Sequence, residues 1–396
     1  MSLRNSFGLE FYFSENEIYL DSATTSKIPI SSLEKMNDFY KILGGGVNRG
    51  THKKAHEANQ ELERARSIIA DVFSVETSRM AFLPSRETAM TNLLHSNLFS
   101  KGDELLVSML DYHSILAPVL KLKEIKDINL NYLSMKDESN LIESLSEKIS
   151  NQTKAVILSS LTLGIGCKRD WQEITRITAE NEALFVLDIS NEAGHVNFDF
   201  SKTYPDAVIS SGNIGALGPQ GTAFQILSEE TIKNFDPILV GGGSVISLEK
   251  NNYRLSSKIK KYEPGTLNIG GILALSNSLR ALSKIGFDTI ELHEKKLRDM
   301  IVDGLSNINK IDVIQIDGIE YGSILSFKSN EIDSYDIAII LEDLGNIAVR
   351  SGALCSHLLL EELKQESLIQ ISTHLYNTEE DIRFFLETLN SVMSEI

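Results

Sequence analysis

The stretch Leu184–Gly221 constrains the fold more than any other part of the sequence. It opens with ALFVLDIS, a short apolar run that is typical of a buried parallel strand and brings Asp188 to the strand's carboxyl end. A second apolar run, AVISS (Ala207–Ser211), leads into SGNIGALGPQG, where four glycines and a proline fall within eleven residues. This composition excludes a helix or strand interior and predicts a backbone that turns tightly or closely approaches another group. The residues alone leave open whether the loop binds a ligand or only connects two elements.

Predicted strands alternate with predicted helices on both sides of this stretch. Strands are expected at 81–83, 103–110 and 153–160, and helices at 53–73, 114–125 and 170–182. Such alternation predicts an α/β fold whose mainly parallel sheet is sandwiched by helices. Ligands of such sheets bind beyond the carboxyl ends of the strands. We therefore expect the functional residues at those ends.

The length predicts two domains. A chain of 396 residues with 42% apolar side chains can bury one large core and a smaller one. We expect a large domain over residues 16–255. Residues 1–15 and 256–396 are expected to form a smaller α+β domain, which begins with long helices near 272–285 and 290–308.

Charge and cysteine content exclude several classes of function. The net charge is −17 without any basic tract, so we expect no nucleic acid partner. No apolar run approaches the roughly 18 residues of a membrane span. The two cysteines, Cys167 and Cys355, fit a reducing compartment, and we expect a cytoplasmic protein with no disulfide framework. No metal site is predicted.

Four motifs carry a resemblance to a known family. Asp188 is followed by NEAGH (191–195), then by SGNI (211–214), then by GPQG (218–221). This order resembles the core of class V aminotransferase-fold enzymes, which use pyridoxal phosphate (PLP), and most closely cysteine desulfurases and selenocysteine lyases. The resemblance covers about residues 16–390. It implies the PLP-dependent transferase-like fold.

The resemblance also implies a set of cofactor-binding residues. Asp188 would pair with the pyridine nitrogen, and Thr88 and Ser211 would lie near the phosphate. Tyr112 takes the position of the family's stacking imidazole. Thr266, in EPGTLN (263–268), corresponds to a threonine that reaches the phosphate of the other subunit. We therefore expect a homodimer, or a heterodimer with an active paralogue.

Several positions depart from the family pattern. Ile214 stands where the family has its Schiff-base lysine, and Asn213 where it has the preceding histidine. Leu161 replaces an asparagine that touches the cofactor, and Gln370 replaces the arginine that clamps the substrate carboxylate. Isoleucine can neither hold the PLP aldehyde as an imine nor move a proton. PLP is thus expected to bind without a covalent link at best.

Lysines elsewhere do not repair this loss. Lys168 and Lys202 lie in the same region but outside the motif. The changes concentrate in groups that touch the substrate and the reacting carbon. They predict a desulfurase-like protein that is degenerate for PLP chemistry. Another class V reaction, such as that of an aminotransferase or a lyase, would also need the lysine.

The segment RSGALC (350–355) resembles the Arg-x-Gly-x-x-Cys loop of a desulfurase subgroup, in which the cysteine attacks the substrate sulfur and carries a persulfide. A guanidinium near a thiol favours the thiolate, so Arg350 and Cys355 are the candidate catalytic pair. The protein would then be a persulfide carrier, exchanging sulfur with another protein, or a non-catalytic partner subunit. The alternative for Cys355 is an inert cysteine, as most free cysteines are.

Overall fold

A mainly parallel seven-stranded sheet forms the centre of the protein, as the alternating pattern predicts. The computed structural model describes residues 2–47 and 50–395. The strand order is β4-β10-β9-β8-β7-β5-β6. β10 runs antiparallel to both of its neighbours, while the remaining pairs are parallel. The strands are β4 (Met80–Leu83), β5 (Glu104–Ser108), β6 (Asn129–Leu133), β7 (Thr153–Ser159), β8 (Leu184–Asp188), β9 (Ala207–Ser211) and β10 (Ala223–Leu227).

Both faces of this sheet are buried, because alternate side chains of each strand enter different hydrophobic cores. In β7, Ala155 and Ile157 join one core, and Val156 and Leu158 join the other. The first core includes α3 (Arg86–Leu94) and α4 (His113–Lys126). The second includes helices from several parts of the chain, namely α2 (Lys53–Val72), α6 (Leu141–Lys148), α7 (Trp171–Glu180) and α9 (Ile269–Ile285). Strands covered on both faces explain the near-continuous apolar runs of the sequence.

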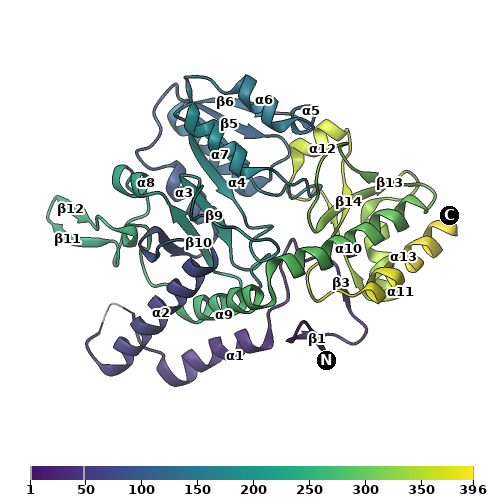
Figure 1. Ribbon diagram of the computed structural model, residues 1–396, viewed down its shortest axis with the longest axis horizontal. Coiled ribbons are helices and arrows are strands. Elements are labelled where there is room, and N and C mark those ends of the chain that lie inside the picture. The colour runs from purple at the N-terminus through teal and green to yellow at the C-terminus, as the bar shows by residue number, and fades with distance from the viewer. Residues whose placement is uncertain (1, 48–49, 396) are drawn as a thin grey trace.

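A smaller antiparallel sheet lies beside the large one (Figure 1). Its order is β13-β14-β17-β16, formed by β13 (Ile311–Ile314), β14 (Ile324–Ser329), β17 (Leu368–Ser372) and β16 (Arg350–Gly352). A separate core joins this sheet to α10 (Phe287–Ser306), α11 (Ser334–Gly345) and α13 (Glu379–Ser394). α12 (His357–Leu363) packs in a fourth core with the loop before it.

Shorter elements complete the fold. The strand pairs are β1 (Ser2–Ser6) with β2 (Leu9–Phe13), β3 (Ile18–Tyr19) with β15 (Ile347–Ala348), and β11 (Val245–Glu249) with β12 (Asn252–Leu255). The remaining helices are α1 (Ile30–Asp38), α5 (Met135–Glu138), α8 (Glu229–Asn234), a π-helix η1 (Phe39–Leu43), and the 3-10 helices η2 (Thr77–Arg79) and η3 (Ile259–Tyr262). No described helix is both long and apolar enough to cross a membrane.

A buried ion network supports the loop at the carboxyl end of β5. The Arg169 guanidinium lies 2.9 Å from Asp111 Oδ1 and 3.0 Å from Glu138 Oε2, and all three side chains are buried. Burial raises the pKa of Asp111, which the Arg169 charge opposes. Because Asp111 directly precedes Tyr112, this network fixes the backbone at a predicted site residue.

Candidate functional site

Asp188 lies at the carboxyl end of β8, as the sequence predicts, and is almost fully buried. Its Oδ1 accepts a hydrogen bond from the backbone N–H of Ser190 at 2.8 Å. Its Oδ2 is buried without a hydrogen-bond partner among the described residues. A buried carboxylate oxygen in this state calls for a nearby positive charge.

Arg86, at the first position of α3, is a positively charged neighbour of Asp188, although its ion-pair partner is Glu87, with Oε1 3.2 Å from Arg86 Nε. The guanidinium carbon of Arg86 lies 4.6 Å from the ring centroid of Tyr112, and its Nη1 lies 3.3 Å from the Tyr112 hydroxyl. Burial, followed by the neighbouring Asp188 carboxylate, raises the pKa of Tyr112 well above its usual value. Tyr112 is 1% exposed. One face of the Tyr112 ring is therefore covered by an arginine of the same chain, and the expected role of Tyr112 in stacking on a cofactor stays a prediction.

The start of α3 carries a carboxylate. Glu87 Oε1 accepts hydrogen bonds from Ser114 Oγ at 2.6 Å and from Arg86 Nε at 3.2 Å. Burial opposes ionisation, but the Ser114 hydrogen bond and the Arg86 charge lower the pKa of Glu87. Thr88 is half-buried, its backbone N–H is capped by Ser85 Oγ, and its hydroxyl lies 3.1 Å from the same oxygen. Glu87 thus places a negative charge at the helix start, on a side chain that is 52% exposed.

The glycine-rich loop is tightly packed. Ser211 Oγ donates to Asn213 Oδ1 at 2.6 Å, and the Asn213 amide donates to Thr25 Oγ1 at 3.3 Å. Ile214 is buried. Gly194, in the segment after β8, packs directly against this loop. Its φ is +104°, and a Cβ there would lie 2.2 Å from the carbonyl oxygen of Gly215.

No lysine replaces Ile214 at this position. Lys168 forms ion pairs with Glu291 and Glu320. Lys202 is exposed in the segment between β8 and β9. The two alternative lysines noted in the sequence are therefore either paired with carboxylates or exposed.

The side chains of Arg350 and Cys355 lie in contact. Arg350 is the first residue of β16, and Cys355 lies in the turn that follows this strand. Arg350 Nη2 is 3.1 Å from Cys355 Sγ, and the cysteine is exposed. Leu354 and Cys355 adopt left-handed backbone conformations with φ of 53° and 55°. The backbone N–H of His113, the residue after Tyr112, donates to the Cys355 carbonyl at 3.0 Å. The cysteine loop therefore adjoins the Tyr112 segment, as a shared site requires.

Of the remaining positions singled out in the sequence, two are buried, and the third lines a cavity that does not include Asp188 or Ser211. Gln370 lies opposite Arg350 in the β16–β17 pair and is buried, donating to the Leu163 carbonyl at 2.6 Å. Leu161 is also buried. Thr266 is exposed and lines a cavity of about 410 Å³ with the glycines of 44–46. Asp188 and Ser211 are not among the residues lining that cavity, so Thr266 does not join them there.

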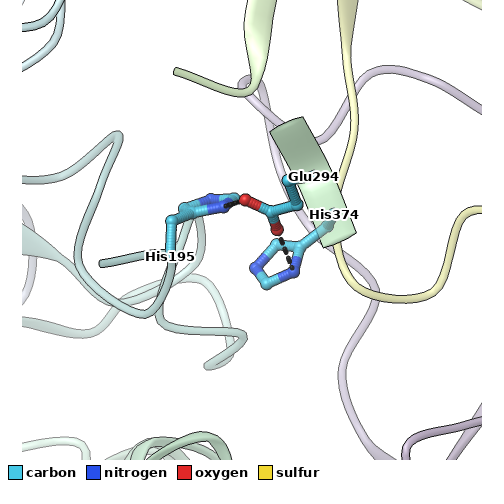
Figure 2. Close-up of side chains that lie close together, drawn as sticks. All are labelled: His195, Glu294 and His374. Atoms are coloured by element: carbon cyan, nitrogen blue, oxygen red, sulfur yellow. Dashed lines mark hydrogen bonds and ion pairs between the residues drawn. The ribbon is translucent and has the colours of Figure 1, made fainter. Parts of the chain in front are cut away.

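Sequence reasoning missed one buried polar cluster. Figure 2 shows the Glu294 carboxylate of α10 between the imidazoles of His195 and His374. His195 Nδ1 lies 2.8 Å from Glu294 Oε2, and His374 Nδ1 lies 3.5 Å from Oε1. Burial raises the pKa of Glu294 to about 8 and lowers the pKa of both imidazoles to about 3. No local motif signals this cluster, because its members come from three distant segments.

The geometry of this cluster is that of a hydrogen-bonded junction. It is the one group of three or more His, Cys, Asp or Glu among residues 2–47 and 50–395 that could hold a metal ion. The His374 Nε2 already contacts the Gly215 carbonyl at 3.0 Å, and its Nδ1 accepts from the backbone N–H of Leu375 at 2.8 Å. We interpret the cluster as a link from the glycine-rich loop to α10.

The fold and site define a class: an α/β protein whose polar residues gather at the carboxyl edge of a mainly parallel sheet, beside a loop cysteine on a smaller sheet. The chain belongs to the aminotransferase class V family, whose model matches residues 18–385.

Known proteins of similar sequence and structure are consistent with this family assignment. A probable cysteine desulfurase of Pyrococcus abyssi is 29% identical over 382 residues, covering 96% of this chain and 95% of the relative. The apo structure of the cysteine desulfurase of Thermococcus onnurineus NA1 has a TM-score of 0.90 at 27% identity, covering 96% and 95% of the two chains. A mutant of C-DES with glycine covalently linked to its PLP cofactor has a TM-score of 0.83 at 19% identity, covering 95% and 96%, which shows a shared fold.

The residues present in this chain do not fit PLP. Asp188 Oδ2 would suit a protonated ring nitrogen. Against this, Arg86 covers the face of Tyr112, Glu87 places a carboxylate at the helix start, and Ile214 offers no amine. A phosphate at this helix start would meet a like charge.

Proposed function

We propose that this desulfurase-like member of the family no longer performs lysine-dependent PLP chemistry and uses Cys355 to accept sulfur from another protein. The observation that carries the proposal is the 3.1 Å contact between Arg350 Nη2 and the exposed Cys355 Sγ. The guanidinium donates a hydrogen bond to this sulfur, and such a donor stabilises the negative charge that the sulfur carries when it acts as a nucleophile. Under this proposal, PLP forms no covalent link with the chain, because Ile214 offers no amine.

Sulfur transfer at Cys355 needs neither a cofactor nor an oxidant. The Cys355 thiolate attacks the outer sulfur of a donor persulfide, forming a new S–S bond as the donor's S–S bond breaks. The donor leaves as a thiolate, and Cys355 becomes the persulfide. The same exchange in reverse passes the sulfur to an acceptor protein.

The surroundings of Cys355 support such an exchange. The thiol is exposed, and the Arg350 guanidinium that contacts it would stabilise the charge of the attacking sulfur. The second cysteine differs in both respects. Cys167 is buried, and burial raises the pKa of its thiol to about 11. The two cysteines of one chain therefore provide an internal comparison.

Alkylation and persulfide transfer test the proposal. In the folded protein at neutral pH, iodoacetamide should modify Cys355 at least about tenfold faster than Cys167, because exposure and a nearby cation control thiol reactivity. Arg350→Ala should slow the reaction at Cys355, whereas Arg383→Ala, at an exposed arginine of α13, should not. A persulfidated donor peptide should add one sulfur atom to Cys355, as read by mass spectrometry.

Two results would count against the proposal. Equal, slow alkylation of both cysteines would indicate an inert Cys355. Sulfur gained by Cys355 at the same rate in the Arg350→Ala variant would remove the proposed role of the guanidinium.

The proposal includes assembly as a homodimer, or as a partner subunit of an active paralogue. Thr266 is exposed beside a cavity of about 410 Å³, where a neighbouring subunit could meet it. Closed two-fold assemblies are also the commonest arrangement of soluble oligomers.

A further inference from the structure

We propose that Arg86 occupies the face of Tyr112 on which a flat cofactor ring would stack, so that this chain excludes a bound pyridine cofactor with its own side chain. The inference deepens the proposed function, because it identifies the side chain that excludes PLP. Loss of the lysine alone would leave an open pocket able to hold PLP non-covalently. A filled pocket would not hold it.

The geometry of three side chains carries this inference. The Arg86 guanidinium lies 4.6 Å over the Tyr112 ring, which is within the range of a cation–π contact. Its side chain is only 13% exposed, and Tyr112 and Asp188 are each 1% exposed. A flat aromatic ligand could not stack on this face of Tyr112 unless the guanidinium moved away.

The charges at the helix start also oppose a bound cofactor. Arg86 is paired with the adjacent Glu87, whose Oε1 accepts hydrogen bonds from Arg86 Nε at 3.2 Å and from Ser114 Oγ at 2.6 Å. A phosphate at the start of α3 would meet this negative charge. Asp188 Oδ2 has no hydrogen-bond partner among the described residues, so the carboxylate that a ring nitrogen would meet is present while the Tyr112 face is covered.

The test uses a probe that cannot react with surface lysines. 4-Deoxypyridoxine 5′-phosphate lacks the aldehyde of PLP, and its binding can be followed by equilibrium dialysis. The double variant Arg86→Gly, Glu87→Thr should bind the probe at least about tenfold more tightly than Glu87→Thr alone, because only the double variant frees the Tyr112 face. The matched control is Arg79→Gly, which removes an arginine stacked on Tyr204 at 4.0 Å, away from Asp188, and should leave binding unchanged.

Three results would overturn the inference. Binding of the probe by Glu87→Thr as tight as that of the double variant would make phosphate repulsion, and not Arg86, the excluding feature. The double variant might fold yet bind no better. If the double variant does not fold, the wild-type protein decides the question. Millimolar probe should leave the melting temperature of the wild type unchanged. A rise in that temperature would show that the wild-type pocket is open and binds the probe.

The outcome is separable from that of the proposed function. Alkylation of Cys355 reports on the Arg350 contact and needs no probe. Probe binding by the wild type would overturn the filled pocket while leaving sulfur transfer untouched.

Discussion

The buried cluster His195–Glu294–His374 leads to a quantitative prediction about stability and pH. Glu294 has a pKa of about 8 in the folded protein, against 4.5 for the ordinary side chain, because of its burial. Between these two values the folded state holds a proton that the unfolded state has released. Stability contributed by this group is therefore complete below about pH 4.5 and is lost as the pH rises through about 8, at about 1.4 kcal/mol per pH unit.

The substitution Glu294→Gln isolates this effect. Glutamine keeps the shape of the protonated acid and can still hydrogen-bond His195, but it does not titrate. The unfolding free energy of the wild type minus that of the variant should fall by roughly 2.7 kcal/mol between about pH 5.5 and 7.5, and become constant well above pH 8. Urea unfolding followed by circular dichroism at each pH gives this difference.

The imidazoles act in the opposite direction. Their folded pKa of about 3 lies below the ordinary 6.5, so the stability they contribute is complete above about pH 6.5 and is lost as the pH falls toward 3. The wild type and Glu294→Gln both retain these imidazoles, so the difference between their unfolding free energies cancels most of the imidazole contribution. Leu292→Gln, at an exposed position of α10, adds no titrating group and should give a constant difference. A constant difference for Glu294→Gln as well would mean that Glu294 is already ionised in the fold, and would refute the reasoning.

Three further predictions concern the cofactor, the core and assembly. After incubation with PLP and reduction with borohydride, peptide mapping should find no phosphopyridoxyl-lysine at the site of the wild type, whereas Ile214→Lys should yield one there once Arg86→Gly has also been introduced. Arg169→Ala should lower the unfolding free energy by about 3–5 kcal/mol in a denaturant titration, because Asp111 and Glu138 would be left as uncompensated buried charges; a loss below about 1 kcal/mol would contradict this. Light scattering of the isolated chain should give twice its mass of 44.0 kDa, and a monomer that dimerises only on addition of an active paralogue would favour the heterodimer.

Much of the fold follows from the sequence, because its signals are local. The strand ending at Asp188 and the strand Ala207–Ser211 are found where their apolar runs predict them. The helix predicted over 53–73 spans Lys53–Val72. Alternation of apolar and polar residues with a fixed period reports on neighbouring residues only, and these elements depend on little else.

The contacts between side chains from different segments depend on the tertiary structure. A family motif could place Arg350 and Cys355 in one loop, but the 3.1 Å contact depends on the left-handed turn that brings the thiol back to the guanidinium. The motif likewise predicts an aromatic face at Tyr112, and only the folded chain shows that Arg86, from the start of another helix, lies over one face of this ring. Long charged side chains reach several ångströms from their backbone, and no pattern of neighbouring residues records where they end.

The junction at Glu294 shows the same limit most clearly. His195, Glu294 and His374 come from a loop after β8, from α10 and from the segment after β17. The motif NEAGH contains His195 but does not reveal its two partners. Their shared burial, which sets all three pKa values, exists only when the large and small sheets are packed together. The sequence by itself determined which elements form and which chemical groups are missing. The packing of those elements determined which of the remaining charged groups meet, because desolvation and Coulomb energy depend on distance in space and not on separation along the chain.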